Sequence, residues 1–123
     1  ELRENIVNTA MEYLGVPYRW GGRTPVGVDC SGLCHSVYLL NGIAIYRNAS
    51  IRSGYPVKSI PYTGAAMGDL LYFPGHMALY LGEGNFIHAT AREGRVCINS
   101  LKQGSPLYRE DLAESLICAG SVF

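Results

Sequence analysis

Cys30 is the residue of this chain best placed to act as a nucleophile. It stands in the run Asp29-Cys30-Ser31-Gly32, where a Gly- and Pro-rich stretch gives way to apolar residues at helical spacing. A helix is therefore predicted to begin at or just after Cys30 and to end near Asn41. The free N–H groups and positive dipole end of a helix start stabilise a thiolate and can lower the pKa of a thiol. The alternative is a buried, inert cysteine, which is common for this residue type.

Two histidines on neighbouring predicted strands could serve such a thiol. His76 opens one apolar run and His88 lies near the end of the next, with a turn at 82–85 between them. Their even separation places both on one face of a hairpin unless a bulge shifts the register. An imidazole can take a thiol proton and later protonate a leaving amine, and a further polar group can hold its orientation. Either histidine alone could instead be structural.

The other cysteines and histidines indicate neither a disulfide framework nor a metal site. Dense frameworks belong to smaller chains with poor cores, whereas this chain has four cysteines in 123 residues. A zinc site would have to gather Cys30, Cys34, His76 and His88, whose spacing departs from the tight pairs of structural zinc sites. His35, opposite the apolar side of the predicted helix, is expected to face solvent.

Composition limits the classes of protein and partner. Hydrophobic residues make up 48% and charged residues 16% of the chain, which predicts one folded domain over residues 1–123. Ten basic residues balance ten acidic ones without a basic run, which argues against nucleic acid as a partner. No apolar stretch approaches the ~20 residues that cross a bilayer, so no membrane span is expected. Because the chain begins at Glu1 without a leader, we expect a processed product or a domain of a longer protein.

The order of the patterns predicts an α+β fold. Residues 1–15 and 30–41 are predicted helices, and residues 43–68 form a long excursion with at most short strands. The first helix is expected to bury Leu2, Ile6, Val7, Ala10, Met11 and Leu14, and the second Leu33, Cys34, Val37, Tyr38, Leu39 and Leu40. About five antiparallel strands follow, at 70–73, 76–81, 86–89, 96–99 and 116–123. The helices are expected to pack on one side of this sheet.

An ordered set of motifs makes the chain resemble the NlpC/p60 family of papain-like murein peptidases. The motifs are Pro17-Tyr18-Arg19-Trp20-Gly21-Gly22, Asp29-Cys30-Ser31-Gly32-Leu33, Gly68-Asp69-Leu70-Leu71-Tyr72-Phe73, His76-Met77-Ala78-Leu79-Tyr80-Leu81-Gly82 and Phe86-Ile87-His88-Ala89. The resemblance implies a papain-like fold and a Cys-His-His triad, with Cys30 as nucleophile, His76 as base and His88 as its orienting group. It also implies that the Tyr18 hydroxyl stabilises the oxyanion together with the Cys30 N–H, and that neither metal nor organic cofactor is needed. Trp20 is expected to pack against the sheet.

Within the family, residues 21–30 and the run Arg47-Asn48-Ala49-Ser50 are similar to the branch that includes dipeptidyl-peptidase VI. That branch cuts after γ-D-glutamate, before the diamino acid, in murein peptides with a free N-terminal L-alanine. The resemblance implies that Asp29 and Ser31 bind the substrate amino group and that Ser50 lines the pocket. A carboxylate beside the nucleophile also opposes thiolate formation.

Several positions depart from this branch and point to an altered substrate groove. Ile51-Arg52 replaces a glutamine pair, Tyr46 replaces a common proline, and the connection Pro74-Gly75 is short. The wall-binding SH3-like modules that precede this domain in relatives would lie outside this chain.

The predicted activity is therefore hydrolysis of the γ-D-glutamyl-diamino acid bond through a thioester on Cys30. The alternatives are a papain-like amidase or acyltransferase, which passes the acyl group to another nucleophile, and a catalytically silent murein-binding module. Diaminopimelate and lysine are both candidates for the third stem residue. An extracellular or wall-associated location is favoured, with cytoplasmic recycling as the alternative.

Overall fold

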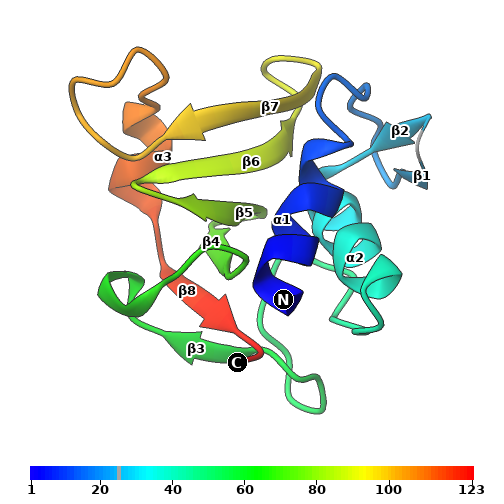
Figure 1. The fold of residues 1–123 in the computed structure, drawn as a ribbon. Coiled ribbons are helices and arrows are strands. Elements are labelled where there is room, and N and C mark those ends of the chain that lie inside the picture. The colour runs from blue at the N-terminus through cyan, green and yellow to red at the C-terminus, as the bar shows by residue number, and fades with distance from the viewer. Residues whose placement is uncertain (25) are drawn as a thin grey trace.

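An antiparallel sheet forms the centre of the protein (Figure 1). The computed structural model describes residues 1–24 and 26–123, and Arg23 by its backbone only; Pro25, in the Gly- and Pro-rich stretch, lies outside the described residues. Six strands of the described chain pair in the order β3-β8-β4-β5-β6-β7. They are β3 Lys58–Ile60, β4 Leu70–Phe73, β5 His76–Gly82, β6 Asn85–Thr90, β7 Arg95–Ser100 and β8 Cys118–Ser121. The predicted α+β fold is confirmed, with β3 as an additional edge strand that the turn-rich excursion concealed.

Three helices and a small hairpin surround this sheet in the described chain. The helices are α1 Leu2–Met11, α2 Cys30–Leu40 and α3 Glu110–Ser115, with a 3-10 turn η1 at Tyr62–Gly64; β1 Arg23–Thr24 pairs with β2 Gly27–Val28. The prediction for α2 is confirmed. The predicted first helix is too long, because after Met11 the N–H groups of Tyr13 and Leu14 donate to carbonyls three residues back, and Gly15 turns the chain at φ 84°.

The apolar faces of both long helices are narrower than predicted. Ile6 and Ala10 of α1 are buried, and Val7 is partly buried. The apolar residues at the ends of the two helices, and one that follows α1, are exposed; these are Leu2, Met11, Leu39 and Leu40, and Leu14. His35, predicted to face solvent, is only partly exposed.

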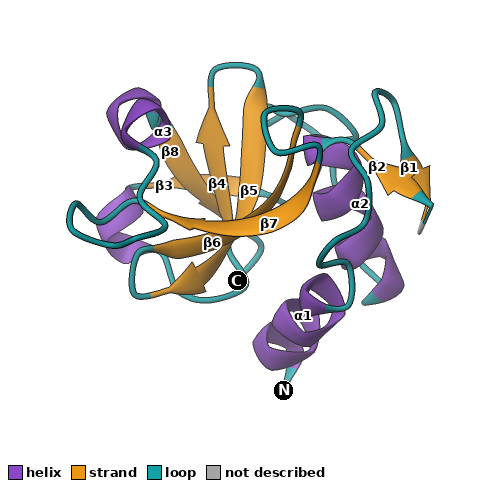
Figure 2. Cartoon of the chain, turned by 90° about the horizontal axis from the view of Figure 1, so that it is seen from above, coloured by secondary structure: helices purple, strands orange, loops and turns teal. Residues whose placement is uncertain are grey.

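The two faces of the sheet bury separate apolar cores. Residues of α1 and α2 pack on one face, where Leu33 and Val37 meet Leu79 and Ile87. On the other face Leu112 of α3 joins a second cluster with Leu71, Phe73, Ala78, Tyr80, Phe86 and Ala119. Figures 1 and 2 show α3 across the strands from α1 and α2. The prediction that the two N-terminal helices pack on one side of the sheet is therefore confirmed. Helix α3 on the other face was not predicted, because its single buried residue gives too short a pattern to detect.

The start of α2 packs directly against the glycine-rich loop. The N–H of Asp29 donates to the carbonyl oxygen of Gly22 at 3.0 Å. A Cβ atom on Gly32 would overlap that same oxygen. Glycine at position 32 thus allows the loop to lie against the helix end that carries Cys30.

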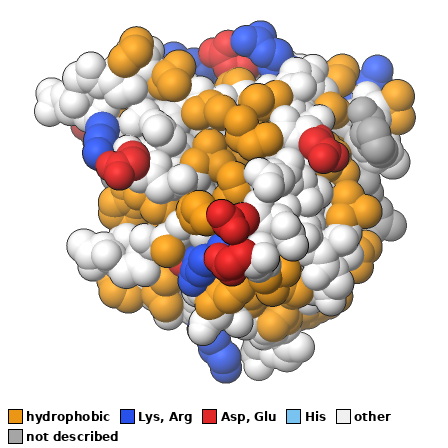
Figure 3. All heavy atoms as spheres, viewed as in Figure 1, with side chains coloured by type: hydrophobic (Ala, Val, Ile, Leu, Met, Phe, Trp, Pro, Cys, Tyr) orange, Lys and Arg blue, Asp and Glu red, His pale blue; other side chains and the backbone are white. Residues whose placement is uncertain are grey.

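Among the described residues, no helix has the length and apolar character needed to cross a bilayer. On the face shown in Figure 3, acidic and basic side chains lie in small scattered groups. This distribution agrees with the equal numbers of acidic and basic residues, ten of each.

We predict that Gly32→Ala lowers the free energy of unfolding by about 2–3 kcal/mol, because the new methyl group must displace the backbone of Gly22. Urea unfolding followed by circular dichroism measures this change. Gly64→Ala is the matched control, since no atom lies within 4 Å of the position of its added Cβ; it should change the stability by less than about 0.5 kcal/mol. Equal stability of the two variants would contradict the close approach of loop and helix.

Candidate active site

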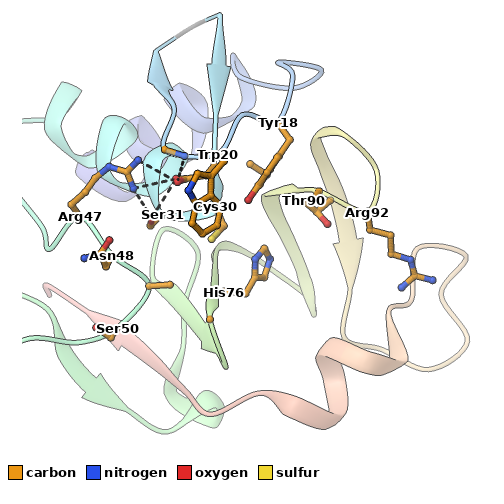
Figure 4. Close-up of a pocket in the computed structure, with 16 residues that line it drawn as sticks. Tyr18, Trp20, Cys30, Ser31, Arg47, Asn48, Ser50, His76, Thr90 and Arg92 are labelled. Atoms are coloured by element: carbon orange, nitrogen blue, oxygen red, sulfur yellow. Dashed lines mark hydrogen bonds and ion pairs between the residues drawn. The ribbon is translucent and has the colours of Figure 1, made fainter.

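A cavity of about 880 Å³ opens where the start of α2 meets β5 and β6. Most residues predicted for the site line it, namely Tyr18, Asp29, Cys30, Ser31, Ser50 and His76. Figure 4 shows Cys30 between Tyr18, Trp20 and His76, with Arg47, Asn48 and Ser50 to one side and Thr90 and Arg92 to the other. The fold thus brings together residues from five separate segments of the chain.

The two hairpin histidines are hydrogen-bonded to each other. Nε2 of His76 lies 2.8 Å from Nδ1 of His88, and the ring planes meet at 75°. Leu79 pairs with Ile87, so His76 and His88 both lie on the opposite face from these residues. The irregularity in the register lies beyond Tyr80, toward the turn, and leaves this parity intact. The prediction that the hairpin brings the histidines together is confirmed.

Asn99 extends the chain of polar contacts and was missed from the sequence. Its Oδ1 lies 2.8 Å from Nε2 of His88, and its Nδ2 donates to the carbonyl oxygen of Leu107 at 3.0 Å. His88 pairs with Cys97 across β6 and β7, so Asn99, two residues further, shares its face. The available signal was the alternation of β7, which places Asn99 on the face of the histidines.

Both histidines are uncharged at neutral pH. Burial lowers the pKa of His76 to about 3, helped by the charges of His88 and Arg109 and opposed by Asp111. Burial also lowers the pKa of His88 to about 4, with the hydrogen bond to Asn99 acting in the opposite direction. His76 therefore has a lone pair with which to accept a proton at physiological pH.

The Cys30 thiol is likewise protonated at rest, contrary to the prediction from the helix start. Burial raises its pKa most, and the negative charge of Asp29 raises it further. The backbone N–H groups of Met77, Ser31 and Cys30 itself act in the opposite direction. The amides of the helix start do favour the thiolate, but burial and the neighbouring carboxylate outweigh them.

Tyr18 and Trp20 lie on the same loop but in different environments. Tyr18 is partly buried, and its hydroxyl lies toward Cys30 (Figure 4). Burial, then the charges of Cys30 and Asp29, raise the pKa of Tyr18, so its hydroxyl is a donor. The expectation that Trp20 packs against the sheet is wrong, because its side chain is 90% exposed at the pocket rim. The Gly22 N–H closes a turn on the carbonyl of Arg19 at 2.8 Å, so Trp20 projects outward from the tip.

Asp29 is the N-cap of α2 and accepts hydrogen bonds from several segments. Its Oδ1 accepts from the Gly32 N–H at 2.6 Å and its Oδ2 from the Gly21 N–H at 3.0 Å. Nη1 of Arg47 lies 3.1 Å from Oδ1 and also donates to the Ser31 hydroxyl at 2.6 Å. Ser31 in turn donates to Asp29 Oδ1 at 3.3 Å. The carboxylate is thus buried and paired with a cation, and its two oxygens accept nearly as many hydrogen bonds as they can.

Ser50 and the cysteines complete the set of residues considered for the site. Ser50 is exposed at the edge of the pocket, on the segment that also carries Arg47. All four cysteines are free thiols, and Cys34 is fully buried in the core. Among the described His, Cys, Asp and Glu side chains, no group of three is arranged to hold a metal ion.

Comparison with known proteins places this geometry in a family. The family model described as NlpC/P60 matches residues 15–112. The chain belongs to the NlpC/P60 family. Its predicted membership is therefore confirmed.

Similar NlpC/P60 proteins include dipeptidyl-peptidase 6 of Lysinibacillus sphaericus, 52% identical over 98% of this chain and 45% of that protein. A gamma-D-glutamyl-L-lysine dipeptidyl-peptidase of Bacillus cereus is 35% identical over 89% of this chain and 34% of its own length. The chain thus spans less than half the length of these two relatives.

Solved NlpC/P60 structures share the fold. A family protein from Bacillus cereus superposes with a TM-score of 0.79 at 34% identity, covering 95% of this chain and 39% of that one. The NlpC/p60 domain of the peptidoglycan hydrolase SagA gives a TM-score of 0.77 at 33% identity, covering 97% of each chain.

We predict that the free energy of unfolding of this NlpC/P60 chain falls as the pH falls from 7 to 5. Both histidines have a lower pKa in the folded state than the usual 6.5. As the pH falls from 7 to 5, they therefore bind protons in the unfolded state but not in the folded state. Each histidine should contribute a loss of up to about 2 kcal/mol over this range. Urea unfolding at the two pH values measures the loss, and His88→Gln should make it smaller. An unchanged pH dependence in that variant would contradict a buried, neutral His88.

Alkylation of Cys30 by iodoacetamide should still accelerate above pH 9, because only the thiolate reacts and the pKa of this thiol is raised. Mass spectrometry of the Cys30 peptide at each pH measures the rate and separates it from the other three thiols. A rate that reaches its plateau below pH 7 would show a resting thiolate instead.

Proposed function

We propose that this protein is a cysteine peptidase that hydrolyses the γ-D-glutamyl-diamino acid bond of peptidoglycan stem peptides through a thioester on Cys30. The observation that carries the proposal is the pocket in which Cys30 lies beside His76, whose other nitrogen is held at 2.8 Å by His88. The names of the relatives, dipeptidyl-peptidase 6 and gamma-D-glutamyl-L-lysine dipeptidyl-peptidase, support this bond as the target.

The proposed reaction begins with proton transfer from the Cys30 thiol to neutral His76. The sulfur attacks the γ-carbonyl carbon, and the resulting oxyanion accepts hydrogen bonds from the Cys30 N–H and the Tyr18 hydroxyl. His76 then gives its proton to the leaving amine as the C–N bond breaks, which leaves a thioester. Water attacks the thioester with His76 as base, and the γ-carboxylate leaves as the thiol regains its proton. No metal or organic cofactor takes part.

Recognition of the acyl part of the substrate is proposed for the side of the pocket that carries Asp29, Ser31 and Ser50. There Asp29 and Ser31 contact the amino group of an N-terminal L-alanine, and Ser50 lines the wall beside it. Because Arg47 already pairs with Asp29 at 3.1 Å, the ammonium group shares this carboxylate with the guanidinium. Hydrogen-bond geometry, rather than net charge, then selects the amine.

Incubation with L-Ala-γ-D-Glu-diamino acid tripeptides tests the proposal. Mass spectrometry should detect L-Ala-D-Glu and the free diamino acid, and Cys30→Ala should abolish both products because it removes the nucleophile. Cys118→Ala is the matched control, since Cys118 lies in β8 outside the pocket. No cleavage by the intact protein, or equal cleavage by Cys30→Ala, would refute the proposal.

The same assay separates the other candidate activities. Acyl transfer to an added amine or alcohol would indicate an acyltransferase, and binding to sacculi without turnover would indicate a silent murein-binding module. Parallel tripeptides that end in lysine or diaminopimelate identify the preferred third residue.

A further inference from the structure

We infer that Asn99 is a positioning residue that fixes the tautomers of both histidines and so keeps a lone pair on His76 for the Cys30 proton. The assignment of tautomers follows from the hydrogen-bond partners of two rings that are both uncharged. Its catalytic meaning rests on the proposed function, in which His76 is the base for Cys30.

The orientation of the Asn99 amide is set by a backbone carbonyl. The oxygen of Leu107 can only accept, so the group 3.0 Å from it must be the Nδ2 donor of Asn99. Oδ1 therefore faces the opposite way, toward His88. The Cys97 thiol donates to the same oxygen at 3.4 Å, which agrees with its role as an acceptor.

The proton positions then follow one bond at a time. Because Oδ1 can only accept, Nε2 of His88, 2.8 Å away, must carry a hydrogen. A neutral His88 has one N–H, so its Nδ1 is an acceptor and Nε2 of His76 must donate to it at 2.8 Å. A neutral His76 likewise has one N–H, which leaves Nδ1 as its basic nitrogen.

Without the Asn99 acceptor, the hydrogen bonds that link His88 and His76 could run in the opposite direction. His88 could then carry its hydrogen on Nδ1 and donate to Nε2 of His76. His76 would hold its own hydrogen on Nδ1, and that nitrogen could no longer accept the Cys30 proton. Asn99 does not line the pocket, so its effect reaches the substrate only through His88 and His76.

The charged groups around His76 and His88 do not determine which tautomers the two rings adopt. Arg109 disfavours protonation of both rings, whereas Asp111 favours it, and Glu93 adds a smaller favourable effect at His88. Arg109 and Asp111 also pair with each other at 2.8 Å. These groups affect whether a ring is charged, whereas Asn99 decides which nitrogen of a neutral ring carries the hydrogen.

The test compares Asn99→Leu with Asn99→Asp and uses long-range proton–nitrogen NMR of the histidine rings. In the unmodified protein both rings should be Nε2–H tautomers. Asn99→Leu should shift His76 toward the Nδ1–H form and lower kcat by about 100-fold with KM unchanged. Asn99→Asp supplies an acceptor again, so it should restore the Nε2–H forms and recover kcat to within about tenfold.

Two further readouts separate positioning from a merely structural role. The carboxylate of Asn99→Asp favours protonated imidazole, so the acid limb of the kcat profile should move to higher pH. Cys97→Ala is the matched control, since it removes the other donor to Oδ1 without fixing a tautomer, and it should keep the tautomers and kcat of the unmodified protein.

An Nδ1–H tautomer of His88 in the unmodified protein would overturn the inference, as would full kcat in a folded Asn99→Leu variant. The ring spectra of the unmodified protein need no substrate. They therefore decide the tautomers of His76 and His88 even if the Asn99→Leu variant fails to fold. Nε2–H tautomers in a protein that cleaves no γ-D-glutamyl peptide would refute the proposed function and leave the assignment at Asn99 standing. Cleavage by a protein with the opposite tautomers would refute only the role of Asn99.

Discussion

The carboxylate of Asp29 is the interaction on which the site depends, because it joins three separate segments of the chain. It caps α2 through the Gly32 N–H, holds the glycine-rich loop through the Gly21 N–H and pairs with Arg47 from the following excursion. The position of Cys30 relative to Tyr18 and to the pocket wall at 47–50 is fixed by these bonds. A buried carboxylate is tolerated here because backbone donors and a guanidinium satisfy its oxygens.

Burial, and then the same carboxylate, oppose ionisation of the Cys30 thiol, and burial keeps His76 uncharged, so the resting site holds a neutral thiol and a neutral imidazole. In the proposed reaction, opposite charges therefore arise only when the proton moves from the Cys30 thiol to His76. Met77 directly follows His76 in β5. Its N–H and the N–H groups of the helix start point at the sulfur, and they stabilise the thiolate as it forms. In the proposed reaction, the sheet therefore contributes both the base and part of the electrostatic support for the nucleophile.

Strong local patterns made much of this arrangement predictable. The helix that begins at Cys30, the strands of the hairpin and the contact between His76 and His88 follow from period, turn residues and parity. What sequence patterns miss depends on tertiary contacts. Helix α3 buries only Leu112, and Asn99 acquires its partners through the pairing of β7 with β6 and the position of the loop at Leu107. The raised pKa of Cys30 reflects burial, a property of the assembled core rather than of the local run.

The exposed position of Trp20 has an optical consequence. It is the one tryptophan among the 123 residues, so the indole emission of the chain comes from the rim of the pocket alone. A ring that is 90% exposed emits from a polar, mobile surrounding, and a peptide laid across the rim replaces that water with apolar and amide groups. The chain therefore carries a built-in fluorophore at the mouth of its pocket, which can be excited apart from its nine tyrosines.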